Sequence, residues 1–96
     1  MPLTHQQIRH LRGLAHHLKP IVMMGNKGIT ENFLVELDRA LENHELIKVS
    51  IAGADKRERC ALTEKICQAS GAEIVQLIGR VSILYRPAKK PQIVIS

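Results

Sequence analysis

Helical and strand-like patterns alternate along this chain, and their order leaves few folds open. Short β-rich runs occupy residues 21–24, 46–51, 74–78 and 81–85, and a helical pattern precedes each of the first three. A helix between two strands lets them pair in parallel, whereas two strands joined by a two-residue turn pair antiparallel. The order α-β-α-β-α-β-β therefore predicts an α/β layer architecture, in which helices pack on a mixed four-stranded sheet.

The three expected helices each begin after a residue with a short side-chain oxygen, which can accept a hydrogen bond from a free N–H group of the first turn. These residues are Thr4, Thr30 and Asp55. We expect helices from Thr4 to the turn before Pro20, from residue 31 to about 43, and from about 56 to 70. Apolar residues recur in each at helical spacing, so each helix has one face for a core.

The strand patterns differ from one another. Residues 21–24 are wholly apolar, which predicts a buried strand, while residues 46–51 alternate between apolar and polar side chains. Gly79-Arg80 separates the last two runs, as in a tight hairpin turn. Residues 87–96 contain two prolines and are expected to form a loose tail with at most an edge segment.

Size and composition indicate one folded domain over residues 1–96, because a chain of 96 residues buries too little surface on folding to form two separate cores. No apolar run approaches the roughly 20 residues of a membrane helix. The beginning of the chain lacks the apolar centre of a signal peptide, so we expect a cytoplasmic protein.

Cys60 and Cys67 stand seven positions apart in an expected helix, about 10 Å along its axis. That separation is too long for a disulfide, so they are expected to be core thiols.

Charge is unevenly distributed. Fourteen Lys and Arg residues against nine Asp and Glu give a net charge of +5. Residues 1–29 hold four of these cations and no acid, residues 30–45 are acidic, and the remainder is basic again. Such separation predicts a positive face, whose usual partner is a polyanion, although a merely soluble basic surface is the alternative.

The expected first helix carries a basic stripe apart from its apolar one. Arg9, Arg12 and His16 recur at the spacing i, i+3 and i+7, and Lys19 follows near the end. Residues at this spacing lie on one helical face, so the stripe faces either water or a ligand.

The loop Gly25-Asn26-Lys27-Gly28 joins the first strand to the second helix. Its two glycines allow the backbone to approach another molecule without a Cβ clash, and the helix that follows offers free N–H groups to an anion such as phosphate. Lys27 adds a positive charge. GxxG loops clamp the nucleic-acid backbone in KH domains, and the alternative here is a plain strand-to-helix turn.

Other chemistries lack a motif. The chain has no P-loop or dinucleotide fingerprint, no nucleophile in an elbow setting, and five histidines without the spacing of a metal site. We therefore expect no enzyme activity, no cofactor, no metal and no small-molecule substrate. Phe33 and Tyr85 are the only aromatic residues, so recognition of a nucleic acid would depend on phosphates, backbone and shape, with little base stacking.

Blocks of sequence resemble a known family. Residues 15–20 (AHHLKP), 24–30 (MGNKGIT), 76–80 (QLIGR) and 84–87 (LYRP) look like the signature blocks of the CRM domain (chloroplast RNA splicing and ribosome maturation). They occur in the family's order and span nearly the whole chain. The chain therefore resembles the stand-alone bacterial form of this domain, the YhbY type.

The resemblance implies an RNA-binding fold similar to the C-terminal domain of bacterial translation initiation factor three. It also implies association with precursors of the large ribosomal subunit, whose assembly bacterial members are thought to assist. By analogy Gly25, Asn26, Lys27 and Gly28 would contact RNA, with the basic first helix beside them. Asn26 departs from the family, where many relatives carry Lys, so the loop has one charge fewer.

We thus expect a monomeric RNA-binding protein that acts in ribosome assembly through the loop and the first helix. Arg80 and Arg86 flank the hairpin and serve either the same surface or the fold. Two alternatives remain open: a protein-interaction module with an acidic partner, and a generic nucleic-acid or DNA-binding protein, since net charge does not separate RNA from DNA.

Overall fold

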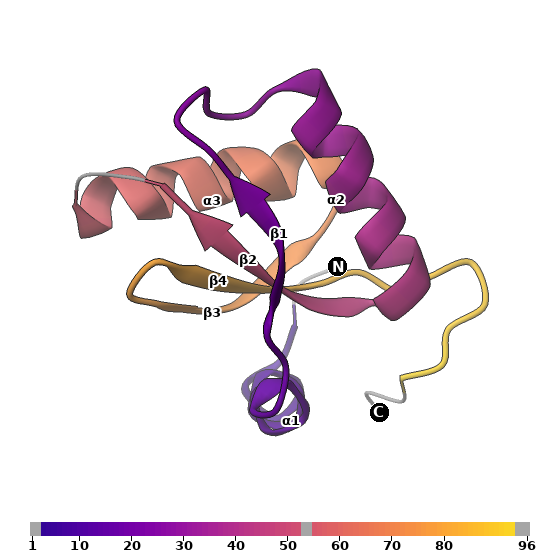
Figure 1. Cartoon of the computed structure of the whole chain (residues 1–96). Coiled ribbons are helices and arrows are strands. Elements are labelled where there is room, and N and C mark those ends of the chain that lie inside the picture. Colours follow the sequence, from indigo (N-terminus) through magenta and orange to yellow (C-terminus); the bar gives the residue numbers. More distant parts are fainter. Residues whose placement is uncertain (1–2, 53–54, 94–96) are drawn as a thin grey trace.

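A computed structural model describes residues 3–52 and 55–93, and it contains the expected order of elements (Figure 1). The elements are α1 (His5–Ala15), β1 (Pro20–Met24), α2 (Glu31–His44), β2 (Leu46–Ile51), α3 (Lys56–Ser70), β3 (Glu73–Ile78) and β4 (Val81–Tyr85). No helix in these two ranges is long and apolar enough to cross a membrane.

The sheet is mixed, with the strand order β1-β2-β4-β3. β1 pairs in parallel with β2, and β4 pairs antiparallel with both β2 and β3. The expected hairpin of β3 and β4 is confirmed, and its turn contains Gly79 at φ +56°. Because β1, β2 and β3 all run in the same direction, their C-terminal ends meet at one end of the sheet. We call this the loop end.

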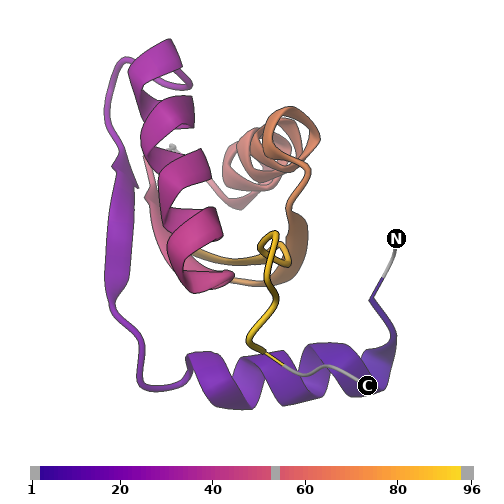
Figure 2. The ribbon, with the colours of Figure 1, turned by 90° about the vertical axis from the view of Figure 1, so that its right-hand side faces the viewer.

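Helices cover both faces of the sheet. α2 and α3 lie on one face and α1 lies alone on the other (Figures 1 and 2). One core forms under α2 and α3 from Val22, Met24, Phe33, Leu37, Leu41, Ile47, Val49, Ile51, Ile66, Ala72 and Leu84. A smaller core forms under α1 from Leu11, Ala15, Leu46, Val75, Ile83 and Tyr85. Successive side chains along β2 and β4 point to these two cores in turn, because neighbouring residues of a strand face opposite sides of the sheet.

The predicted caps are present. The Thr4 hydroxyl accepts a hydrogen bond from the Gln7 N–H at 3.1 Å, and the Gln7 side chain accepts one from the Thr4 N–H at 2.9 Å, which completes a capping box. Asp55 accepts from the Glu58 N–H at 2.8 Å at the start of α3. Gly71 closes that helix at φ +77°, a conformation that glycine adopts without a Cβ penalty.

α1 is shorter than expected. It ends at Ala15, whereas the apolar pattern predicted helix up to the turn before Pro20. The Leu18 N–H donates to the Ala15 carbonyl at 2.9 Å, a tight turn that follows the helix. Pro20 disfavours helical backbone at the residue before it, and β1 already begins at Pro20, so the chain must leave the helix earlier. Leu18 consequently lies 38% exposed and outside the α1 core.

The segment after β4 is anchored, although the sequence predicted a loose tail. Glu45 accepts hydrogen bonds from the backbone N–H groups of Ala88, Gln92 and Ile93 at 3.0, 2.7 and 3.0 Å. Glu42 accepts another from the Lys89 N–H at 3.0 Å. Residues 87–93 contain no strand, and Val94 and Ile95 of the apolar end lie outside the described residues.

Candidate functional site

The GxxG loop is open to solvent. Gly28 adopts φ +78°, and its N–H donates to the Gly25 carbonyl at 3.1 Å, which closes a tight turn. Gly25, Asn26 and Lys27 are exposed. A Cβ atom added at Gly25 or Gly28 would meet no atom within 4 Å, so this protein fills no space there. The glycines leave the backbone accessible to a second molecule.

α2 begins directly behind this loop. The Thr30 hydroxyl accepts a hydrogen bond from the Phe33 N–H at 3.1 Å and caps the helix. A capped helix start still presents the positive end of its dipole, which favours an anion in front of it. Glu31 in the first turn opposes an anion at that point, so Lys27 is the positive side chain that the loop itself offers.

A second candidate surface is the groove between α1 and the edge of the sheet. Its volume is about 420 Å³. It is lined by Arg9, Arg12, Gly13 and His16 of α1 and its C-cap, by Gln76 and Ile78 of β3, and by Ile83 of β4. The predicted basic stripe is therefore one wall of a groove, and no carboxylate lines it. A Cβ at Gly13 would also meet no atom within 4 Å, which keeps the wall open.

The loop and this groove are separate surfaces. α1 lies on the opposite face of the sheet from α2 (Figure 1), and the groove lies at the β3 edge, whereas the loop follows β1 at the other edge. The five residues of β1, which span about 17 Å, separate the end of α1 from the loop. The expectation that the first helix lies beside the loop is therefore wrong, because the chain crosses the sheet edge between them. Lys19 lies in the connection to β1, where it borders a different pocket.

Arg80 lies at the loop end of the sheet. It belongs to the turn of the β3–β4 hairpin, its side chain is exposed, and its carbonyl accepts a hydrogen bond from the Ile51 N–H at 2.7 Å. The Arg59 side chain holds the same turn through a bond from its Nε to the Gly79 carbonyl at 2.9 Å. Arg80 is therefore placed at the same end of the molecule as the loop.

Arg86 has a structural position. Its guanidinium donates to the Asp38 carboxylate at 2.7 Å, to the Ser70 carbonyl at 2.8 Å and to the Asp38 carbonyl at 3.2 Å. Its side chain is 18% exposed, and Glu42 lies 3.7 Å away. Of the two roles left open for Arg86, these contacts support the one in the fold, where it links α2 to the end of α3.

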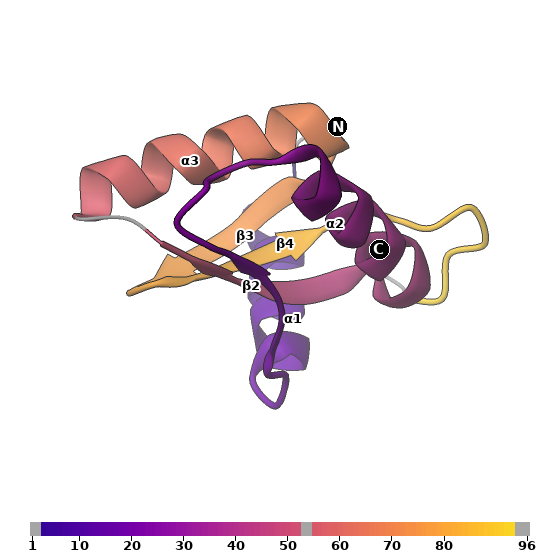
Figure 3. The same cartoon turned by 45° about the horizontal axis from the view of Figure 1, so that its top comes forward.

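The first turn of α3 adds two cations that the sequence analysis did not select, Lys56 and Arg57. Both are exposed. α3 lies beside the loop (Figure 3). Glu58 and Leu62 line a pocket of about 360 Å³ together with Gly25, Asn26 and Gly28. The sequence could have indicated this position, because the loop follows β1 and α3 follows β2, and segments that follow neighbouring parallel strands meet at the same end of a sheet.

In the part of the chain that the structure describes, no three His, Cys, Asp or Glu side chains gather as a metal site requires. Two groups of exposed cations border the candidate surfaces. Lys27, Lys56, Arg57 and Arg80 lie at the loop end, and Arg9 and Arg12 lie in the groove with His16. Such an arrangement can bind an extended polyanion at two places.

Comparison with known proteins gives a consistent set of relatives. The sequence model of the CRS1/YhbY (CRM) domain matches residues 3–86. A Haemophilus influenzae protein named as an RNA-binding protein is 45% identical, with 95% of this chain and 92% of that protein covered. A Pseudomonas aeruginosa protein named as a probable RNA-binding protein is 43% identical, with 95% and 88% covered.

A solved structure has the same fold. The solution structure of a Staphylococcus aureus protein, described as a candidate RNA-binding protein, superposes with a TM-score of 0.84. The two chains are 40% identical, and the match covers 95% of each.

Proposed function

Because this chain belongs to the CRS1/YhbY (CRM) domain family, we propose that it is a non-enzymatic, cytoplasmic protein that binds RNA through the GxxG loop and the α1 groove. The names of its relatives support RNA as the partner. The single structural observation that carries the proposal is the groove in which Arg9, Arg12 and His16 converge without any lining carboxylate.

Binding is positional in this proposal. The backbone of Gly25–Gly28 and the side chain of Lys27 take one phosphate segment at the loop end, with Arg80 nearby. The guanidinium groups of Arg9 and Arg12 take a second segment in the groove. The two aromatic side chains, Phe33 and Tyr85, are 5% and 3% exposed, so neither offers a stacking platform to a base. Recognition therefore depends on charge and on the shape of a folded RNA.

The partner that we propose is ribosomal RNA in precursors of the large subunit, which this protein would hold while it folds. Sedimentation of a cell lysate on a sucrose gradient tests this step. We expect the protein to migrate with large-subunit precursors, and the double change Lys27→Ala and Arg12→Ala to release it to the top of the gradient. If the wild type already sediments as free protein at low salt, the role in assembly is wrong.

A matched competition separates RNA from DNA. An RNA duplex and a DNA duplex of the same sequence are added to a complex of the protein with labelled RNA. We expect the RNA duplex to compete at least tenfold better, because the two duplexes differ in groove shape and in the 2′-hydroxyl groups. Equal competition would favour a generic nucleic-acid-binding protein.

A further inference from the structure

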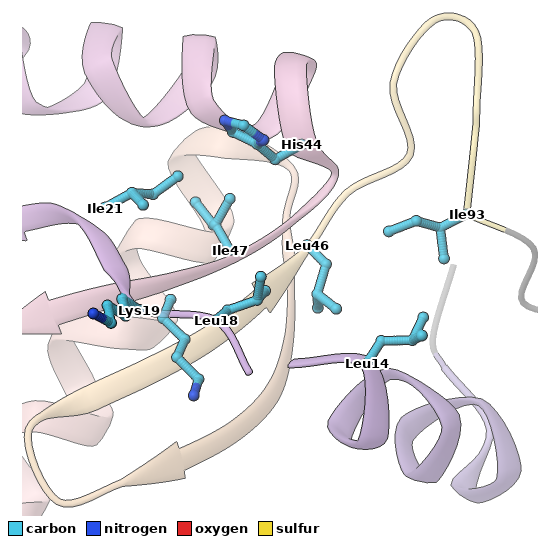
Figure 4. Close-up of a pocket in the computed structure, with 9 residues that line it drawn as sticks. Leu14, Leu18, Lys19, Ile21, His44, Leu46, Ile47 and Ile93 are labelled. Atoms are coloured by element: carbon cyan, nitrogen blue, oxygen red, sulfur yellow. The ribbon is translucent and has the colours of Figure 1, made fainter. Parts of the chain in front are cut away.

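An apolar pocket of about 360 Å³ lies away from the GxxG loop and the α1 groove. It is enclosed by the end of α1, the first residues of β1 and β2, and the end of α2 (Figure 4). Its apolar lining comes from Leu14, Leu18, Ile21, Leu46, Ile47 and Ile93. Figure 4 shows these side chains around one opening, although they come from α1, the connection after it, β1, β2 and the segment after β4. A volume of this size is within the usual range of ligand sites.

Half of the apolar lining residues are exposed, whereas Leu46 and Ile47 at the base are buried. Leu14 is 44% exposed, Leu18 38% and Ile21 50%, while Met23 on the same edge strand is 73% exposed. Neither core includes these four residues. Single exposed apolar residues need no explanation, but a group of them around a pocket marks a binding surface.

Two lysines border this pocket. Lys19 and Lys48 complete its lining together with His44, and no Asp or Glu is part of it. The apolar walls offer nothing to a phosphate backbone, and neither Phe33 nor Tyr85 lines the pocket. A ligand that matches this pocket therefore has apolar groups for the walls and negative charges for the lysines at the border.

We propose that this pocket docks a protein partner through a segment in which apolar side chains are flanked by Asp or Glu. β1 favours such a segment, because it is an edge strand that pairs only with β2 among the described strands. Ile21 lines the pocket from β1, and an extended segment along the outer edge of β1 would place its own side chains over the pocket. This docking site is independent of RNA binding.

Two pools of synthetic 12-residue peptides test the proposal. Both pools carry Leu, Ile, Val or Met at alternate positions, and the intervening positions hold Asp or Glu in one pool and Lys or Arg in the other. We expect the full-length protein to retain peptides from the acidic pool only. Their addition should shift the amide resonances of Leu18, Lys19, Ile21 and residues 46–48. Equal retention from both pools, or from neither, would overturn the proposal.

Two substitutions locate the binding. Leu18→Glu and Ile21→Glu place a carboxylate at exposed positions of the pocket, and each should lower peptide affinity at least tenfold. Val35→Glu is the matched control, because Val35 is a 57% exposed apolar residue of α2 outside the pocket, and it should leave affinity unchanged. Thermal unfolding followed by circular dichroism shows that each variant folds. Peptides that bind Leu18→Glu as tightly as wild type would contradict the assignment.

Other occupants give different results. If the pocket joins two copies of this chain, the wild type sediments as a dimer, Leu18→Glu sediments as a monomer, and the peptides fail to bind. If residues 94–96 of the same chain fill it, the acidic peptides bind only a variant that ends at Ile93. Either outcome would overturn docking of a partner protein.

Discussion

The Nε atom of Arg12 donates a hydrogen bond to the Oε1 atom of Gln76 across 3.1 Å, which links the basic stripe of α1 to strand β3. The bond fixes the guanidinium at the wall of the groove before any ligand arrives. Arg12 is therefore already oriented, and less side-chain freedom is lost when it meets a phosphate.

Gln76→Ala should consequently weaken RNA binding without removing a charge. We expect a loss of about 0.5 to 1 kcal/mol, or roughly two- to fivefold in affinity, as for a typical hydrogen bond. The dependence on salt should stay the same, because the number of phosphate contacts does not change. Fluorescence anisotropy with labelled RNA measures both quantities. Gln68→Ala, at an exposed position of α3, is the control. An equal loss of RNA affinity in that variant would contradict the orienting role of Gln76.

Arg86→Ala tests whether Arg86 stabilises the fold or binds RNA. The guanidinium satisfies two backbone carbonyls, Ser70 and Asp38, so its removal should lower the free energy of unfolding by about 1 to 3 kcal/mol. The ion pair with Asp38 adds little, because the Asp38 side chain is 67% exposed. Urea unfolding measures the change. RNA affinity of the folded variant should equal that of the wild type, and a flatter salt dependence would return Arg86 to the binding surface.

The sequence predicted the local structure well, because its signals are local. The caps at Thr4, Thr30 and Asp55 and the C-cap glycine Gly71 all act within a few residues, and the structure confirms each of them. The alternation over residues 46–51 likewise depends only on which side chains face the two cores.

Features that depend on distant contacts were not predictable in the same way. Nothing local indicates that β4 inserts between β2 and β3, since that choice depends on pairing across the whole sheet. The distance between α1 and the loop follows from the same topology. Lys56 and Arg57 join the loop end only because two parallel strands finish together there. The anchored tail depends on Glu45, more than 40 positions away from the residues it binds.

Glu45 occupies a position where glycine is common. It ends α2 at φ +66°, and its carboxylate is buried against the tail. Burial alone would raise the pKa of this carboxyl group, but hydrogen bonds from the Gln92, Ala88 and Ile93 N–H groups outweigh it and lower the pKa below the ordinary value of 4.5. The use of the carboxylate as an anchor accounts for an acidic residue in this conformation.

The lowered pKa predicts a loss of stability in acid. A carboxyl group with a lowered folded pKa stabilises the protein fully above its unfolded pKa, and this contribution is lost as the pH falls through the folded value. Urea unfolding of the wild type should therefore show falling stability below about pH 4.5. Glu45→Gln should be less stable at pH 7, by about 1 to 3 kcal/mol, and should lose part of that acid dependence. An unchanged dependence on pH would show that Glu45 does not anchor the tail.

Cys67 should be a slow thiol. Burial, together with the charges of Glu73 and Glu64, raises its pKa to about 11 from 9.0. Because only the thiolate reacts, alkylation by iodoacetamide at pH 8 should be about one hundred times slower in the folded protein than at an ordinary cysteine. Mass spectrometry of peptides after timed labelling measures this rate, which should still be rising steeply at pH 10 because the pKa is about 11. Equal rates for Cys67 in folded and urea-unfolded protein would contradict the effect of burial.

The central claim is that two cationic surfaces, the loop that follows β1 and the groove beside β3, bind the same RNA. The most direct test is the affinity for precursor large-subunit RNA as a function of salt, measured for the wild type, Lys27→Ala, Arg12→Ala and the double variant. Each single change should flatten the logarithmic salt slope by about 0.7 to 0.9, and the two losses of free energy should add, because the residues are far apart. A double variant that binds RNA with the wild-type affinity and salt slope would contradict the account.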